Sequence, residues 1–118
     1  MKKFVLLVAS FLFFNSGTAL ADHHEYKQKK LIENERITVF IATLPPGAES
    51  PSVARELDRV VYAVKGGTIQ RNYADGSTAL YTYKTGDAVY ADQPQDKQKY
   101  SIKNIGNSTV ILQVTHLK

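Results

Sequence analysis

Turn-forming residues bracket the most informative stretch of the chain, which runs from Leu44 to Gly67. Pro45-Pro46-Gly47 opens this stretch, Gly66-Gly67 closes it, and the apolar run Val60 to Val64 lies just before the second turn. Proline fixes φ and removes a hydrogen-bond donor, whereas glycine permits positive φ, so both ends indicate chain reversals. We therefore expect a loop followed by a β-strand between two turns.

Short strands separated by turn signals are predicted along the rest of the chain. Asp75-Gly76 is a strong hairpin signal, and no segment after Asp22 shows sustained helical periodicity. Many short strands at close spacing are typical of an all-β sandwich or barrel. The expected strands cover Leu31-Ile32, Arg36 to Leu44, Arg59 to Lys65, Thr68 to Tyr73, Thr78 to Tyr83, Ala88 to Tyr90, Lys99 to Asn104 and Thr109 to Leu117.

The first 21 residues have the pattern of a secretory signal peptide. Lys2 and Lys3 provide a positive start, an apolar stretch runs from Phe4 to Phe14, and Ala19-Leu20-Ala21 fits the small-x-small cleavage site. The apolar stretch is too short for a bilayer core of about 30 Å, so we expect cleavage rather than an anchor. Residues 22–118 should then form a single domain that is periplasmic or secreted and has no membrane span.

Composition excludes several classes of function. The 118 residues contain no cysteine, which excludes disulfides, thiol catalysis and lipoprotein attachment. Losing Lys2 and Lys3 lowers the formal net charge of +4 by two, and no basic cluster is interleaved with aromatic residues, so we expect no nucleic-acid partner.

The segment from Asp22 to Gln28 should be polar and mobile, and its neighbouring lysines fit a solvated arm. These are Lys27, Lys29 and Lys30.

The stretch opened by Gly47 resembles the first motif of the cupin family. That motif reads Gly, five residues, His-x-His, three or four residues, Glu, six residues, Gly. Gly47 and Gly66 stand at its two ends at the correct spacing. Val53 and Arg55 stand where the family has its two histidines, and Arg59 stands where it has glutamate.

The second cupin motif is matched at both of its ends. Gly86-Asp87 corresponds to its start and Asn104 to its end, and Tyr100 stands at its histidine position. The resemblance covers about Ile32 to Leu117 and implies a small double-stranded β-helix, a jelly-roll-like barrel. Cupin barrels are often dimeric, so a homodimer is among the expected assemblies.

The four positions that correspond to cupin metal ligands do not suit a metal ion in this chain. Cupin metal sites use neutral imidazoles and one carboxylate. Here the positions hold Val53, Arg55, Arg59 and Tyr100. We therefore expect no metal or other cofactor in the barrel, and no metal-dependent chemistry.

Arg55 and Arg59 are the main candidates for ligand contacts. If the motif spacing reflects the structure, both point into the barrel, where a carboxylate, phosphate or sugar acid could neutralise them. Tyr100 could add a hydroxyl group to such a site. The alternative is a bulge that turns both arginines outward, to pair at the surface with Glu56 and Asp58.

Three functions remain open from the sequence. We favour an exported module that binds a small anionic or polyhydroxylated ligand through Arg55, Arg59, Tyr100 and His116. His116 is included because it is in phase with the apolar residues of the last strand. One alternative is a dimeric adaptor, which needs an exposed apolar patch. The other, less favoured, is a metal-independent enzyme that uses His116 or Tyr100 as an acid or base.

The new N-terminus left by cleavage could also bind metal. It would read Asp22-His23-His24. A free amine, two backbone amides and a third-position imidazole can hold Cu(II) or Ni(II) in a square plane, a geometry these ions prefer. An adventitious tail with no metal-binding role is the favoured alternative.

Overall fold

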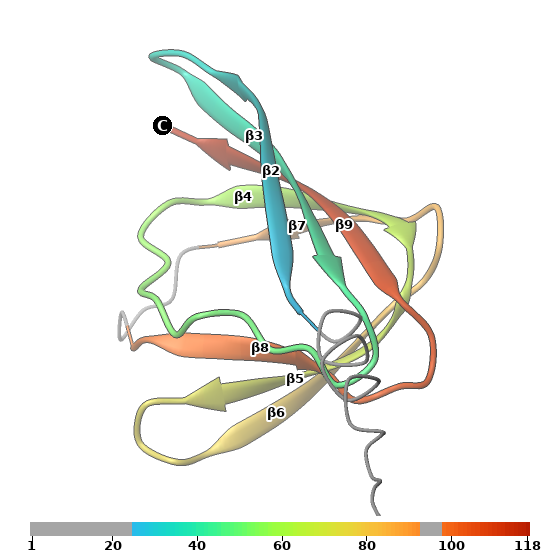
Figure 1. The fold of residues 1–118 in the computed structure, drawn as a ribbon. Coiled ribbons are helices and arrows are strands. Elements are labelled where there is room, and N and C mark those ends of the chain that lie inside the picture. Colours follow the sequence, from blue (N-terminus) through green and yellow to red (C-terminus); the bar gives the residue numbers. More distant parts are fainter. Residues whose placement is uncertain (1–24, 93–97) are drawn as a thin grey trace, which may run out of the picture.

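Two facing β-sheets make up the protein, as Figure 1 shows for a computed structural model that describes residues 25–92 and 98–118. One sheet has the order β2-β3-β9-β4-β7 and the other has the order β6-β5-β8. The all-β prediction is confirmed. The strands are β2 (Lys27–Glu33), β3 (Ile37–Leu44), β4 (Arg59–Lys65), β5 (Gly67–Tyr73), β6 (Thr78–Tyr83), β7 (Ala88–Ala91), β8 (Tyr100–Asn104) and β9 (Val110–Leu117).

Two of the sequence predictions lie outside the described residues. These are the signal peptide, residues 1–21, and the metal site at His23 and His24. Within the described ranges we find no helix of a length and hydrophobicity that would cross a bilayer.

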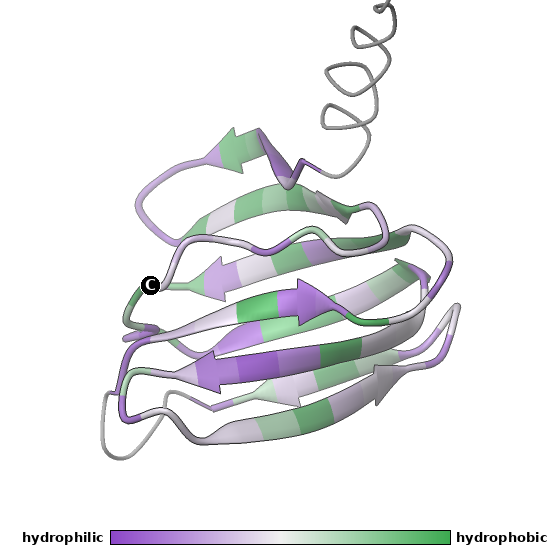
Figure 2. Cartoon of the chain, turned by 60° about the horizontal axis from the view of Figure 1, so that its bottom comes forward, coloured by the Kyte–Doolittle hydropathy of each residue, from purple (hydrophilic) through white to green (hydrophobic). Residues whose placement is uncertain are grey.

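Alternation along the strands directs one apolar set of side chains into the space between the sheets. Ala42 pairs with Leu112 and Leu44 with Val110 in the β3–β9 register, and directly opposite residues share a face of the sheet. Figure 2 shows the resulting bands of hydrophobic and hydrophilic residues. The buried apolar core comprises Ala42, Leu44, Ala48, Val61, Ala63, Ile69, Val110, Leu112 and Val114.

The loop between β3 and β4 extends the three-stranded sheet. Isolated bridges pair Glu49 with Lys103 and Val53 with Tyr100, so the loop runs antiparallel along the free edge of β8. The Val53 and Tyr100 amides donate to each other's carbonyl groups, both at 3.2 Å. This pairing fixes the position of Arg55, two residues farther along.

Strand β2 corrects the prediction for the N-terminal segment. We expected a mobile arm as far as Gln28, with lysines in solvent, but Lys27–Glu33 forms a full strand beside β3. The strand side chains are exposed as expected. The backbone nevertheless pairs, because ladder hydrogen bonds do not require apolar side chains, and lysines are common on edge strands. This strand places Tyr26, which precedes it, over the barrel.

Asn104 joins the end of β8 to the other sheet. Its side chain is almost fully buried, with 1% exposure, and its amide group donates to the carbonyl oxygens of Leu44 and Ser108, each at 2.8 Å. Its Oδ1 accepts from the Gly106 amide at 2.9 Å. Buried polar groups that lose their partners are costly, so this side chain stabilises the strand that carries Tyr100.

Asn104→Leu should lower the free energy of unfolding by about 2–3 kcal/mol, because the buried Leu44 carbonyl, the Ser108 carbonyl and the Gly106 amide would lose a partner at similar side-chain volume. Urea denaturation followed by circular dichroism measures the change. Asn107→Leu, at an exposed position, is the matched control and should alter stability by less than about 0.5 kcal/mol. Equal effects of the two substitutions would contradict this role of Asn104.

Candidate functional site

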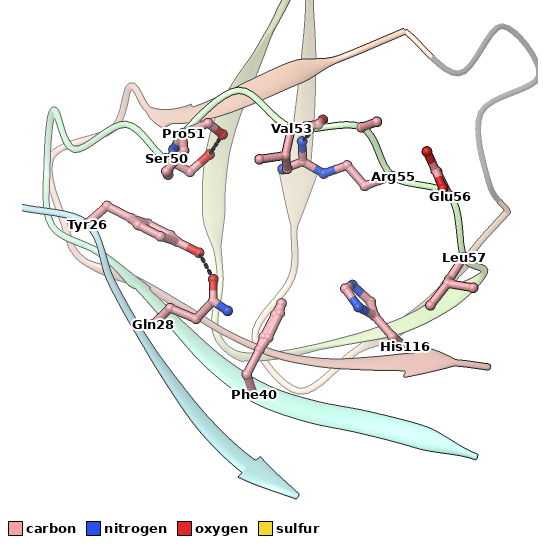
Figure 3. A pocket seen from close by; sticks show the side chains of 11 residues that line it. Tyr26, Gln28, Phe40, Ser50, Pro51, Val53, Arg55, Glu56, Leu57 and His116 are labelled. Carbon is pink, nitrogen blue, oxygen red and sulfur yellow. Dashed lines mark hydrogen bonds between the residues drawn. The ribbon is translucent and has the colours of Figure 1, made fainter. Parts of the chain in front are cut away.

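A pocket of two adjoining cavities lies between the sheets, beneath the loop that connects β3 to β4. The outer cavity has a volume of about 470 Å³ and the inner one of about 70 Å³. Tyr26, Phe40, Arg55 and His116 line both. Figure 3 shows Phe40 and His116 rising from the five-stranded sheet, with Arg55 opposite them on the loop.

Tyr100 stands at the inner end of this pocket, with three guanidinium groups around it. Its side chain is 1% exposed, and its hydroxyl accepts a hydrogen bond of 2.6 Å from Nη2 of Arg59. The guanidinium carbons of Arg55 and Arg71 lie 3.9 and 4.5 Å from its ring centroid. Cations at these distances from an aromatic ring are attracted by its quadrupole, so Tyr100 partly compensates the close approach of three like charges.

No carboxylate neutralises these arginines within residues 25–92 and 98–118. Arg59 is only 7% exposed, and none of the three arginines forms an ion pair in the described part of the chain. Nη1 of Arg59 and Nε of Arg71 are buried without a hydrogen-bond partner there. Such groups are uncommon in folded proteins. The pocket is therefore strongly cationic and has unused donors.

Each arginine reaches the pocket from a different element. Arg59 opens β4 opposite His116 of β9, so both side chains lie on the inner face of the sheet. Arg71 is in phase with the fully buried Ile69 of β5, because alternate strand residues share a face. Arg55 sits on the loop, where its Nη1 donates to the carbonyl groups of Val53, at 2.8 Å, and of Tyr100. These hydrogen bonds satisfy donor groups of Arg55, but the carbonyls are neutral and leave its positive charge uncompensated.

The structure brings together the four predicted ligand-binding residues, because Arg55, Arg59, Tyr100 and His116 all line the inner cavity. Their binding role stays a prediction. The alternative in which Glu56 and Asp58 pair with the two arginines is not seen within the described ranges. The Asp58 carboxylate instead accepts a hydrogen bond of 2.8 Å from the hydroxyl of Tyr90.

Two other pocket residues escaped the sequence prediction. Arg71 had a usable signal, because it lies two residues from both Ile69 and Tyr73 and so shares their face of the strand. A charged residue in phase with apolar strand residues indicates a functional interior position. Its guanidinium carbon also lies 4.0 Å from the ring centroid of Tyr81. Tyr26 had no such signal, because it lies in a polar segment that we expected to be mobile.

His116 stands between the two cavities, with its ring against Phe40. The two ring centroids are 5.2 Å apart in an edge-to-face arrangement. Burial lowers the pKa of His116, and the positive charges of Arg59 and Arg55 lower it further. The neutral imidazole is thus favoured at pH 7. Within the described residues its side chain forms no hydrogen bond to a nucleophile, which gives no support to an acid–base pair.

The side chains at the family's metal positions do not fit a divalent cation. A guanidinium has no lone pair to donate and is not deprotonated in proteins, and Arg55 and Arg59 contribute two of them. No group of three His, Cys, Asp or Glu that could hold a metal ion occurs among the described residues. The donor chemistry of this pocket suits an anion.

Several solved structures have a fold similar to that of this chain. A cupin domain from Bordetella pertussis superposes with a TM-score of 0.70 at 18% identity, over 80% of this chain and 94% of that one. An RmlC-like cupin with a double-stranded β-helix fold from Methanocaldococcus jannaschii superposes with a TM-score of 0.62 at 22% identity, over 81% of this chain and 83% of that one. The polyketide cyclase RemF from Streptomyces resistomycificus superposes with a TM-score of 0.56 at 16% identity, over 78% of this chain and 64% of that one. No family model and no curated protein matches the sequence.

These similarities establish the cupin fold, a double-stranded β-helix, as the resemblance of the two motifs implied. They do not assign an activity, because one fold supports unrelated functions. The function has to be argued from the pocket itself.

The lowered pKa of His116 predicts how stability depends on pH. As the pH falls below the ordinary histidine pKa of about 6.5, the unfolded chain takes up the proton before the folded chain does, so stability decreases. Denaturant unfolding should show that the free energy of unfolding falls between pH 7 and pH 5, and that this fall is smaller in His116→Gln. The same loss in both proteins would contradict a depressed pKa at this residue.

Proposed function

We propose that this chain is an exported, metal-independent binding module that holds a small anion inside its cupin-fold barrel. Arg55, Arg59 and Arg71 supply the positive charge, and Tyr100 and His116 complete the lining of the inner cavity. The observation that carries the proposal is the pair of buried donors without partners, Nη1 of Arg59 and Nε of Arg71. The signal-peptide pattern of residues 1–21 supports the export.

Electrostatics favours an anion over a neutral ligand. An unpaired buried charge carries a desolvation penalty of several kcal/mol, which a counter-charge with good hydrogen bonds can offset. A carboxylate or phosphate matches the planar donor fork of arginine. A neutral polyhydroxylated ligand could accept hydrogen bonds from the two free donors, but it would leave the charge uncompensated.

The adaptor alternative has one observation in its favour. Tyr62, Val64 and Tyr90 are 40%, 43% and 57% exposed, on the strands β4 and β7 that pair at one edge of the larger sheet. Exposed apolar side chains of this kind can mark an interaction surface. They do not account for the buried arginines, and for this reason we place anion binding first.

A thermal-shift panel of small anions tests the proposal on the purified protein. At about ten times its Kd, a bound anion stabilises the fold by about 1.4 kcal/mol, which should raise the Tm by roughly 5–10 °C in a domain of this size. Arg59→Met and Arg55→Met should remove the shift. Arg36→Met, at an exposed position, is the matched control and should retain it.

A flat panel for the native protein would overturn the anion proposal and favour the adaptor. A shift that survives in both pocket variants would place the anion somewhere else on the molecule. Methionine is chosen because it keeps most of the arginine volume, so loss of packing should not imitate loss of binding. Each variant's Tm without added anion shows whether its fold is intact.

A further inference from the structure

We infer that the ligand is an organic monocarboxylate with a compact apolar body, whose carboxylate lies in the inner cavity and whose body fills the outer one. This inference rests on the proposed anion site and specifies its ligand. It follows from the unequal size, charge and lining of the two cavities.

The inner cavity limits the size of the charged group. Its volume is about 70 Å³, and a single water molecule needs about 10–15 Å³ of such space. A carboxylate, with three heavy atoms, fits in this volume beside Arg59 and Arg71, which line the cavity. A sugar ring with its hydroxyl groups does not fit, so the larger part of the ligand must lie outside.

The outer cavity is suited to an apolar body. Its volume of about 470 Å³ is within the range of pockets that hold small organic molecules. Val53 and Leu57 line it and are 46% and 37% exposed, so an apolar ligand would cover them. The remaining apolar lining comes from Tyr26, Phe40, Pro51 and Ala54.

The charges around the outer cavity favour a single negative charge on the ligand. Glu56 lines this cavity and forms no ion pair within the described ranges, so it repels a second anionic group there. His116 adds no positive charge at pH 7, because burial and the two nearby arginines lower its pKa. Positive charge is therefore concentrated at the inner end, which Arg55, Arg59 and Arg71 line, whereas Arg55 is the one arginine of the described residues that also lines the outer cavity.

The route between the cavities is formed by the residues they share. Figure 3 shows the Tyr26 ring and Phe40 on one side of the outer cavity and Arg55 across from them. The Tyr26 hydroxyl is held by Gln28 Oε1 at 2.8 Å, which keeps this ring over the pocket. A flat or slender body can pass between these walls while its carboxylate reaches Arg59.

Isothermal titration calorimetry of the purified protein tests the inference with four probes: 3-phenylpropionate, its neutral amide, acetate and inorganic phosphate. 3-Phenylpropionate should bind at least about tenfold more tightly than acetate or phosphate, because only it buries an apolar body. It should also bind at least about tenfold more tightly than the amide, which lacks the charge.

Two variants separate the apolar body from the charge. Leu57→Asn in the outer cavity should weaken 3-phenylpropionate binding several-fold and leave acetate binding unchanged. Leu80→Asn is the matched control, since Leu80 is 63% exposed on β6 and does not line the pocket, and it should have no effect. Glu56→Gln should improve the binding of the dianion phenylsuccinate more than that of 3-phenylpropionate.

The contrary outcomes are distinguishable. If acetate and phosphate bind as tightly as 3-phenylpropionate and lose binding in Arg59→Met, the anion site stands and the apolar body is wrong. If no probe binds, the proposed function fails and the inference fails with it. If the amide binds as tightly as the acid, the pocket selects apolar ligands without regard to charge, which overturns both.

Discussion

The close approach of three guanidinium groups to one buried tyrosine is the constraint on which the rest of the pocket depends. Arg59 donates to the Tyr100 hydroxyl, and Arg55 and Arg71 lie over its ring. Three like charges in a half-buried space repel one another, and their cation–π contacts offset only part of that repulsion. A chain under selection for stability alone would more easily fill this space with apolar side chains. The cluster is therefore better explained by a ligand than by the fold.

The cupin scaffold can hold this cluster because its strands place side chains at fixed positions whatever their chemistry. Arg55, Arg59 and Tyr100 occupy positions that correspond, by the motif resemblance, to metal ligands of the family. Guanidinium groups in place of imidazole and carboxylate at such positions suit an anion instead of a metal cation. The register of the surrounding strands is kept. Asn104 and the pairing of the loop with β8 support the site without lining it.

Much of the fold could be predicted from the sequence, because turn residues and strand alternation report on local structure. The boundaries of β4 and β6 were predicted to the residue, and those of most other strands lay within one. Of strand β2 only Leu31-Ile32 was predicted, since an exposed edge strand has no apolar alternation. At the site, Arg55 and Arg59 could be placed only through the motif spacing. Arg71 could have been found from its phase with Ile69, but its approach to Tyr100 and the position of Tyr26 required the fold. Residues far apart in sequence meet in this pocket only when the two sheets face one another.

A crystal structure of the protein in sodium bromide would test the central claim most directly, because the anomalous signal of bromide locates a bound anion without knowledge of the natural ligand. The account predicts a peak inside the barrel, within hydrogen-bonding contact of Nη1 of Arg59 and Nε of Arg71. The same crystals of Arg59→Met should lack that peak. Bromide found only at the outer surface, with carboxylates from the chain itself turned in to neutralise the arginines, would contradict the account.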